Sequence, residues 1–187
     1  MSVVSDLPEA EVDRCLAELA AENLAALDRG PFGGWSLTDS GRSTDDDSLR
    51  RQLDGSGARE HIRGCYERFL GLNANLLRVC SDWQMRTIGN TPTLNDHTDA
   101  DYDASVLSRL IRIDAPAQDL LAEIVASLDR FDIYRRRLSN ALEQAMAGSH
   151  SHVADSLDSY HMVWFQLHED LLTTLGISRD EERERSP

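Results

Sequence analysis

The positions of apolar residues along the chain predict several long helices. Apolar side chains recur at steps of three and four residues, the spacing that lines one face of an α-helix, in the segments 58–83, 102–113, 116–146 and 159–172. Pro116 fits the first turn of a helix, so we expect a new helix, the longest of the chain, to begin near Asp114. The pattern predicts a mainly α fold with an antiparallel helical bundle domain over residues 43–176.

Turn-forming and charged residues predict the remaining segments. Residues 8–27 are expected to form an N-terminal helix, and a glycine-rich turn at 28–34 leads to a short extended run at 35–38. Residues 88–101 are rich in Gly, Asn, Thr, Pro and Asp, which predicts a long loop. Residues 177–187 mix Arg with Glu and predict a frayed, charged tail.

Two histidines lie on the apolar side of the helix predicted at 159–172. His161 and His168 share this face with Trp164, and a buried polar group that lacks a partner costs about 1–3 kcal/mol. The imidazoles must therefore have hydrogen-bond partners or a ligand. Asn73 stands among apolar neighbours in the same way on the helix predicted at 58–83.

A small-molecule pocket between the helices is one interpretation of these polar positions. It predicts a ligand-binding set of aromatic, imidazole and amide side chains, namely Tyr66, Asn73, Trp83, His97, His161, Trp164 and His168. The alternative is a buried network whose groups bond only to one another and fix the register of the helices. An open cavity beside His161 and His168, lined by Trp83 and Asn73, favours the pocket over the network.

The spacing of candidate ligands does not predict a metal or a catalytic centre. His161 and His168 are seven residues apart, about 10 Å along a helix axis, which is too far for one ion. His168 with a loop residue such as His97, or the pair His150 and His152, can form a site, but no spacing requires one. The sequence also contains neither a G-x-S-x-G motif nor a Gly-rich phosphate loop. We therefore predict no metal ligand, no cofactor, no catalytic residue and no enzymatic activity.

The charge and composition of the chain argue against nucleic acids and membranes as partners. The chain carries a net charge of −14 over 187 residues, which opposes binding to the phosphates of nucleic acids unless a local basic patch exists. All 19 basic residues are Arg, and the contents of 41% hydrophobic and 28% charged residues are those of a globular protein. No apolar run approaches the roughly 18 residues that span a membrane, and the N-terminus lacks a signal pattern. We expect a cytoplasmic protein without membrane contact.

Three cysteines, Cys15, Cys65 and Cys80, occur without a C-x-x-C pair. An odd number of widely spaced cysteines in a cytoplasmic protein favours reduced thiols over a disulfide framework. Cys65 and Cys80 lie on or beside an apolar helix face, so we expect both to pack in the core.

The N-terminal segments resemble a winged helix. The helix, the turn, the extended run and the segment L-T-D-S-G-R at 37–42 resemble the recognition helix and wing of MarR-like transcriptional regulators. The resemblance implies a truncated winged-helix-like segment over residues 1–42, with Arg14, Arg29 and Arg42 as the DNA-binding side chains. The helix itself carries five acidic residues that repel phosphate, namely Glu9, Glu11, Asp13, Glu18 and Glu22. The alternative is a degenerate winged helix that serves packing or dimer formation and does not bind DNA.

A second resemblance covers nearly the whole chain. It rests on G-W-S-L-T-D-S-G-R at 34–42, Y-E-R-F-L at 66–70, L-N at 72–73, W-Q at 83–84, N-D-H at 95–97 and S-Y-H-M-V-W-F-Q-L-H-E-D-L-L at 159–172. These segments are similar to an actinobacterial family whose members are described as transcriptional regulators. A similar module is attached to some pyruvate phosphate dikinase-like proteins.

Two functions follow as hypotheses. The first is a transcriptional regulator whose helical domain senses a small-molecule effector, whose winged-helix-like segment binds DNA, and which forms a homodimer. The second is an interaction or accessory module that binds a protein partner or a small ligand but not DNA. The acidic surface favours the second hypothesis, and the L-T-D-S-G-R segment favours the first.

Overall fold

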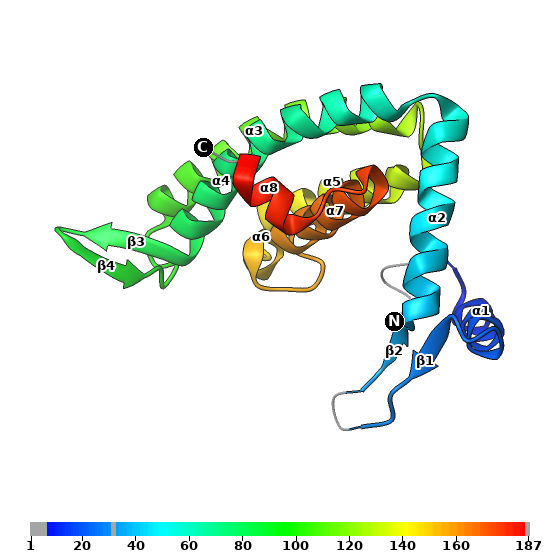
Figure 1. The fold of residues 1–187 in the computed structure, drawn as a ribbon. Helices are drawn as coiled ribbons and strands as arrows, with labels where there is room; N and C mark the ends of the chain where they lie inside the picture. The colour runs from blue at the N-terminus through cyan, green and yellow to red at the C-terminus, as the bar shows by residue number, and fades with distance from the viewer. Residues whose placement is uncertain (1–6, 31–32, 186–187) are drawn as a thin grey trace. The chain divides into compact units, whose positions relative to one another are not determined.

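The structure, a computed structural model, describes residues 7–30 and 33–185. Its described elements are mostly helices, together with two antiparallel two-stranded hairpins (Figure 1), so the prediction of a mainly α fold is confirmed. The chain divides into two units, Met1–Gln52 and Leu53–Pro187. The division falls inside helix α2 (Asp39–Ser56), ten residues beyond the boundary after residue 42 that the sequence predicted.

The first unit contains α1 (Glu9–Ala21), β1 (Ala25–Leu27), β2 (Trp35–Leu37) and most of α2. The prediction of a helix up to residue 27 is wrong, because Asn23 has a left-handed backbone (φ 59°) that turns the chain out of α1. β1 and β2 pair as antiparallel strands, with Ala25 opposite Leu37. The predicted extended run is thus a strand of a hairpin whose other strand the periodicity assigned to the helix.

The L-T-D-S-G-R segment has a structural role at the start of α2. The backbone N–H of Gly41 donates to Thr38 Oγ1 at 2.9 Å, which caps the helix. A Cβ atom on Gly41 would lie 1.9 Å from the carbonyl oxygen of Leu24, so a larger residue cannot fit there. Arg42 donates to the carbonyl oxygen of Leu37 at 2.7 Å. The segment therefore fixes the start of α2 against the β1–β2 hairpin.

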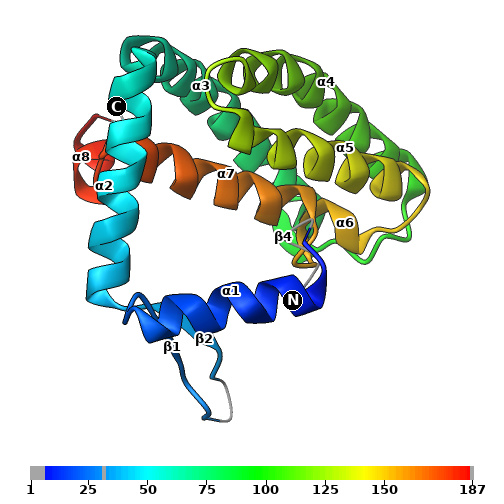
Figure 2. The ribbon, with the colours of Figure 1, turned by 90° about the vertical axis from the view of Figure 1, so that its right-hand side faces the viewer.

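Four helices form an antiparallel bundle in the second unit, α3 (Arg59–Gln84), α4 (Ala100–Val125), α5 (Asp132–Met146) and α7 (Tyr160–Leu175). α3 packs on α4, α4 on α5, α5 on α7 and α7 on α3, so the ring of contacts closes around a common core (Figures 1 and 2). The largest fully buried side chains of that core include Trp83, Trp164, Tyr160, Phe69 and Phe131. Burying large apolar side chains contributes about 1.5–3 kcal/mol each, which makes this core the main source of stability.

The helix break predicted at residues 114–116 lies elsewhere. α4 continues through Pro116 to Val125, and the chain turns at the 3₁₀ helix η1 (Asp129–Phe131) before α5. The apolar stripe of α4 runs on either side of the proline, where Ile113 and Ala117 are both buried. Asp114 lies inside α4 and therefore does not cap a helix; its carboxylate accepts from the Tyr160 hydroxyl at 3.0 Å. Tertiary packing thus overrides the local preference of proline to begin a helix.

Two segments predicted to be irregular are ordered elements. The first part of the expected loop belongs to a hairpin of β3 (Met85–Ile88) and β4 (Thr91–Leu94), and the expected frayed tail contains α8 (Arg179–Arg185). The hairpin turns at Gly89, whose φ is 64°. β4 is exposed throughout and contains a proline, so it lacks the alternation that reveals a half-buried strand.

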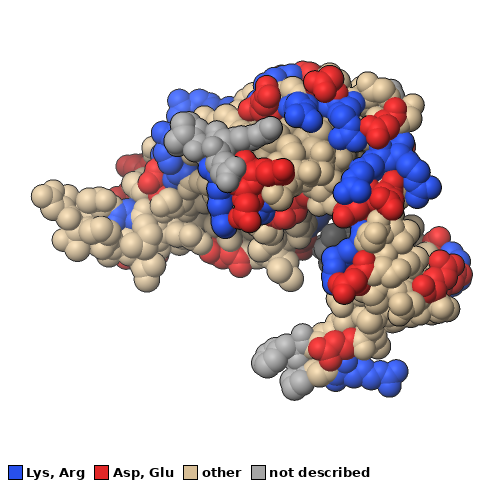
Figure 3. Space-filling model, in the orientation of Figure 1, with Lys and Arg blue, Asp and Glu red and all other residues tan. Residues whose placement is uncertain are grey.

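Charged side chains of both signs alternate over the face of the helices seen in Figure 3, whereas the β3–β4 hairpin shows a mostly uncharged surface there. Ile88 is 55% exposed and Leu94 73% exposed on that hairpin. Among the helices in the described part of the chain, none is long and apolar enough to cross a membrane.

The cysteines are free thiols of two kinds. Cys15 is half-buried on α1, whereas Cys65 and Cys80 are buried, as predicted. Burial raises the pKa of Cys65, and it raises the pKa of Cys80 to about 12. Because the thiolate is the nucleophile, we expect a disulfide reagent at pH 8 to modify Cys15 at least about a hundredfold faster than Cys80. Mass spectrometry of the labelled native protein measures this, and equal labelling of all three residues would contradict the burial of Cys80.

Candidate functional site

Helix α7 supplies one wall of the candidate site. The Ser159 hydroxyl accepts from the backbone N–H of Met162 at 3.2 Å and caps the helix, and Gly176 (φ 68°) ends it. Both ends agree with the predicted helix. Trp164 and His168 are buried on the inner side of α7, while His161 is half-buried at its edge.

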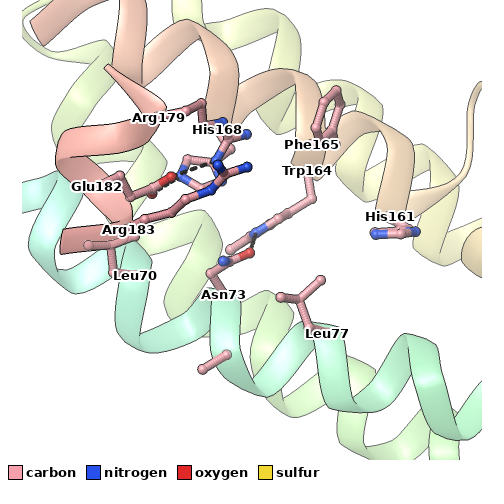
Figure 4. Close-up of a pocket in the computed structure, with 11 residues that line it drawn as sticks. Leu70, Asn73, Leu77, His161, Trp164, Phe165, His168, Arg179, Glu182 and Arg183 are labelled. Atoms are coloured by element: carbon pink, nitrogen blue, oxygen red, sulfur yellow. Dashed lines mark hydrogen bonds and ion pairs between the residues drawn. The ribbon is translucent and has the colours of Figure 1, made fainter. Parts of the chain in front are cut away.

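A groove of about 730 Å³ lies between α3, α7 and α8 (Figure 4). Its volume falls within the range of about 300–1,000 Å³ that is typical of small-molecule sites. It is lined by Leu70, Asn73, Ala74, Leu77, His161, Trp164, Phe165, His168, Arg179, Glu182 and Arg183. The groove brings together four of the seven predicted ligand-binding residues.

An indole ring forms the inner side of the groove. Trp164 stacks on Phe69 with ring centroids 4.6 Å apart, and its indole N–H donates to Asn73 Oδ1 at 3.0 Å. Asn73 thus has the hydrogen-bond partner that we expected for a polar residue among apolar neighbours. The amide nitrogen of Asn73 and the ring of His161 make no hydrogen bond with any of the residues that the structure describes, so both stay available to a ligand.

A carboxylate from α8 binds at one end of the groove. Glu182 Oε1 accepts from the hydroxyl of Tyr66 and lies 2.6 Å from His168 Nε2, while Arg179 donates to Oε2 at 2.6 Å. Arg179 also faces Nδ1 of His168 at 3.4 Å. Because a guanidinium can only donate, Nδ1 must accept, which places the imidazole proton on Nε2, directed at Glu182. His168 is therefore neutral here and Glu182 is charged.

The pKa directions agree with this assignment. Burial lowers the pKa of His168, and this effect outweighs the opposite influence of the Glu182 charge. Burial on its own raises the pKa of Glu182, but the hydrogen bonds from Tyr66 and Arg179 outweigh it and the pKa is lowered. The network is thus built for the neutral imidazole and the ionised carboxylate.

Acidification should weaken this network. The unfolded chain takes up a proton on His168 near pH 6.5 and the folded chain only at lower pH, so stability falls as the pH drops below about 6.5. Glu182 adds a second loss below about pH 4.3, its unfolded pKa. We expect the free energy of unfolding to fall more steeply between pH 7 and 5 in the native chain than in His168→Gln, as measured by urea denaturation. Equal slopes would contradict the lowered pKa of His168.

The predicted residues separate into two places. Asn73, His161, Trp164 and His168 line the groove, and Tyr66 lies buried beneath it through its bond to Glu182. Trp83 and His97 are not at the groove but pack against each other, with ring centroids 4.6 Å apart. The expectation that Trp83 and His97 share a pocket with His161 and His168 is therefore wrong.

Sequence reasoning missed the residues that α8 contributes to the groove. Arg179, Glu182 and Arg183 were assigned to a tail, although the chain carries a start signal for this helix. Ser178 and Glu181 form a capping box, in which the backbone N–H of Ser178 donates to Glu181 and that of Glu181 donates to Ser178 Oγ. The S-x-x-E spacing was the available signal.

The predicted DNA-binding arginines all lie in the first unit. Arg14 donates to Glu18 at 2.8 Å, and Arg42 pairs with Asp39 at 2.6 Å. Arg29 is exposed between the two strands of the hairpin. The charges of Arg14 and Arg42 are therefore balanced by neighbouring carboxylates.

Comparison with known proteins supplies no template for the site, because no protein-family model, no curated protein and no solved structure matches the chain. The function must be inferred from the residues of the groove themselves.

Proposed function

We propose that this chain is a ligand-responsive regulatory protein whose helical unit binds a small organic anion with an apolar body. The observation that carries the proposal is the groove between α3, α7 and α8, which combines apolar walls with the polar side chains of Asn73, His161 and Arg183. Such a combination is typical of small-molecule sites.

The apolar body of the ligand is inferred from the groove walls. Leu77 on α3 and Phe165 on α7 border the groove and are each 49% exposed, so both side chains are accessible to a ligand in the groove. Figure 4 shows them on opposite helices, with Trp164 between. A ligand that covers both side chains gains about 25 cal/mol for each Å² of apolar surface removed from water.

The anionic group is inferred from the donors. Arg179 is engaged by Glu169 and Glu182, but Arg183 forms only a solvent-exposed 3.5 Å pair with Asp180, and exposed pairs contribute little. The guanidinium of Arg183 can therefore donate hydrogen bonds to a carboxylate in the groove. The imidazole of His161 and the amide of Asn73 can do the same. A charge-assisted hydrogen bond from arginine is the strongest contact available there.

Calorimetric titration with sodium decanoate and 2-naphthoate, each compared with its neutral amide, tests the proposal. We expect saturable binding of at least one acid, about tenfold weaker in Leu77→Ala or Phe165→Ala because each removes about 1.4 kcal/mol or more of apolar contact. Arg183→Gln should abolish the preference for acid over amide. Ile111→Ala and Arg136→Gln, which alter exposed residues outside the groove, are the matched controls.

Absence of binding to all four probes would contradict the proposal, and so would equal affinity in the native chain and the groove variants. Binding that changes as much in Ile111→Ala as in Phe165→Ala would show that the acids adhere to apolar surface in general.

The DNA-binding part of the regulator hypothesis is supported by the order of α1, hairpin and α2 in the first unit. The balanced charges of Arg14 and Arg42 weaken it. A fluorescent DNA duplex titrated at increasing salt separates the two possibilities, because a DNA-binding protein must lose affinity steeply as salt rises. No binding at low salt would leave a regulatory protein that acts on another partner.

The second candidate function is a protein-interaction module, favoured by the apolar β3–β4 hairpin. Ile88 and Leu94 are exposed there, and large exposed apolar patches mark interaction sites in soluble proteins. If the hairpin joins two copies of the chain, light scattering should give a dimer mass for the native chain and a monomer mass for Leu94→Ser.

A further inference from the structure

Three metal-ligating side chains converge in the second unit, outside the groove. His97 follows β4, Asp103 lies in the first turn of α4, and His150 directly precedes the short helix α6 (Ser151–Ala154). One donor atom from each lies within 4.8 Å of the other two. We propose that His97, Asp103 and His150 bind a divalent transition metal ion, for which Zn²⁺ has the best-matched ligand preference.

The carboxylate of this cluster is fixed before any ion binds. Asp103 is 5% exposed, and its Oδ1 accepts from the amide of Asn95 at 2.8 Å. The same amide donates to the backbone carbonyl of Trp83 at 3.0 Å, which ties the carboxylate to the end of α3. Hydrogen bonds that hold a ligating carboxylate in place are characteristic of metal sites.

The two imidazoles are held beside this carboxylate. Nδ1 of His97 lies 3.0 Å from Asp103 Oδ2, and the ring centroids of His97 and His150 are 5.0 Å apart. Trp83 packs on both rings, with centroids 4.6 Å from His97 and 5.4 Å from His150. Its indole covers one side of the cluster and limits the access of water to the ligand atoms.

The separations suit a tetrahedral ion. Zinc–ligand bonds of about 2.0–2.1 Å place neighbouring donor atoms roughly 3.3 Å apart, and the 3.0 Å gap between His97 and Asp103 is close to this value. The ion replaces the shared hydrogen on Nδ1, and the imidazole carries its proton on Nε2 instead. His150 is exposed, so its side chain can close the remaining distance by rotation. Three protein ligands leave the fourth position open to water.

The competing explanation is a hydrogen-bonded cluster that needs no ion. Among the described residues, the one ion-pair partner of Asp103 is His97, and the nearby Arg86 pairs with Asp96 and Asp99 instead. A purely structural cluster accounts for the hydrogen bond between His97 and Asp103 and for the ring packing of His150, but it does not need a nitrogen donor at His150. His150 therefore distinguishes the two explanations.

The test uses the full chain freed of metal with EDTA and dialysed. Titration calorimetry with ZnCl₂, and visible absorption with CoCl₂ as a spectroscopic substitute, should show one ion for each chain in tetrahedral surroundings. We expect His97→Ala, Asp103→Asn and His150→Ala each to weaken binding by at least about tenfold. Because His150 is exposed, His150→Ala should keep the native circular dichroism spectrum and is the decisive variant.

Two controls exclude other histidines. His152→Ala alters the neighbouring half-buried histidine. His61→Ala alters another cluster among the described residues that could hold an ion, which consists of His61, Cys65 and Glu123. Neither substitution should change the affinity. The proposal is overturned if the native chain shows no saturable binding, if His150→Ala binds as tightly as the native chain, or if His61→Ala alone removes the site.

Discussion

Glu182→Ala is expected to lower the free energy of unfolding by about 3 kcal/mol, because removing one partner of a buried ion pair leaves the others without compensation. Glu182 is 9% exposed and receives three short contacts, from Tyr66, His168 and Arg179. Its loss leaves the hydroxyl of Tyr66 and the imidazole of His168 beneath a helix that no longer binds them. We expect α8 to detach in a large fraction of the molecules.

Urea denaturation followed by tryptophan fluorescence measures the stability, and limited trypsin digestion measures the detachment. Trypsin should cleave after Arg179 and Arg183 faster in Glu182→Ala than in the native chain, since both arginines lie on α8. Asp180→Ala is the matched control, because Asp180 stands on the same helix with its side chain 90% exposed, and it should change stability by about 0.5 kcal/mol or less. Equal effects of the two substitutions would mean that Glu182 has no special contacts.

The long helices were predictable because their periodicity is sustained and most of their apolar faces are buried. α3 and α7 lie where the sequence placed them, and the Ser159 cap and the Gly176 terminus follow from the preferences of helix ends. The break between α4 and α5 was misplaced because Pro116 carries a strong local signal, whereas the turn at Ser127 and Leu128 carries a weak one. The apolar face of α4 packs in the core on both sides of Pro116 and keeps the helix continuous there. Such tertiary packing cannot be inferred from a single sequence.

The candidate site was predictable in part for the same reason. Asn73, Trp164 and His168 could be identified because each carries a polar side-chain group on an apolar helix face. Buried polar groups need hydrogen-bond partners. The identity of those partners depends on which helices become neighbours. The bond between Trp164 and Asn73 joins residues 91 positions apart, and the carboxylate that binds His168 belongs to a helix that the sequence did not reveal. Trp83 and His97 obey the same rule but lie in another cluster.

Trp164→Ala should have a still larger effect, about 4 kcal/mol of lost stability, which is the usual cost of deleting a fully buried indole and leaving a cavity. Trp164 is 2% exposed, stacks on Phe69 and lies against Tyr160 at 6.2 Å between centroids. The same ring is the inner side of the groove, so organic anions should no longer bind with measurable affinity even where the variant is folded.

Two neighbouring substitutions separate the contributions of this ring to stability and to binding. Trp164→Phe keeps an aromatic surface but loses the hydrogen bond to Asn73, so it should cost about 1 kcal/mol for that bond and retain weakened binding. Phe165→Ala removes a ring that is 49% exposed on the outer wall, so it should weaken binding about tenfold while changing stability by less than about 1 kcal/mol. Urea denaturation and calorimetric titration on the three variants measure both quantities. If Phe165→Ala lowered the stability but not the affinity, Phe165 would belong to the core and the groove would not be a ligand site. If Phe165→Ala lowered the affinity but not the stability, the ligand would lie between Leu77 and Phe165, above the indole of Trp164.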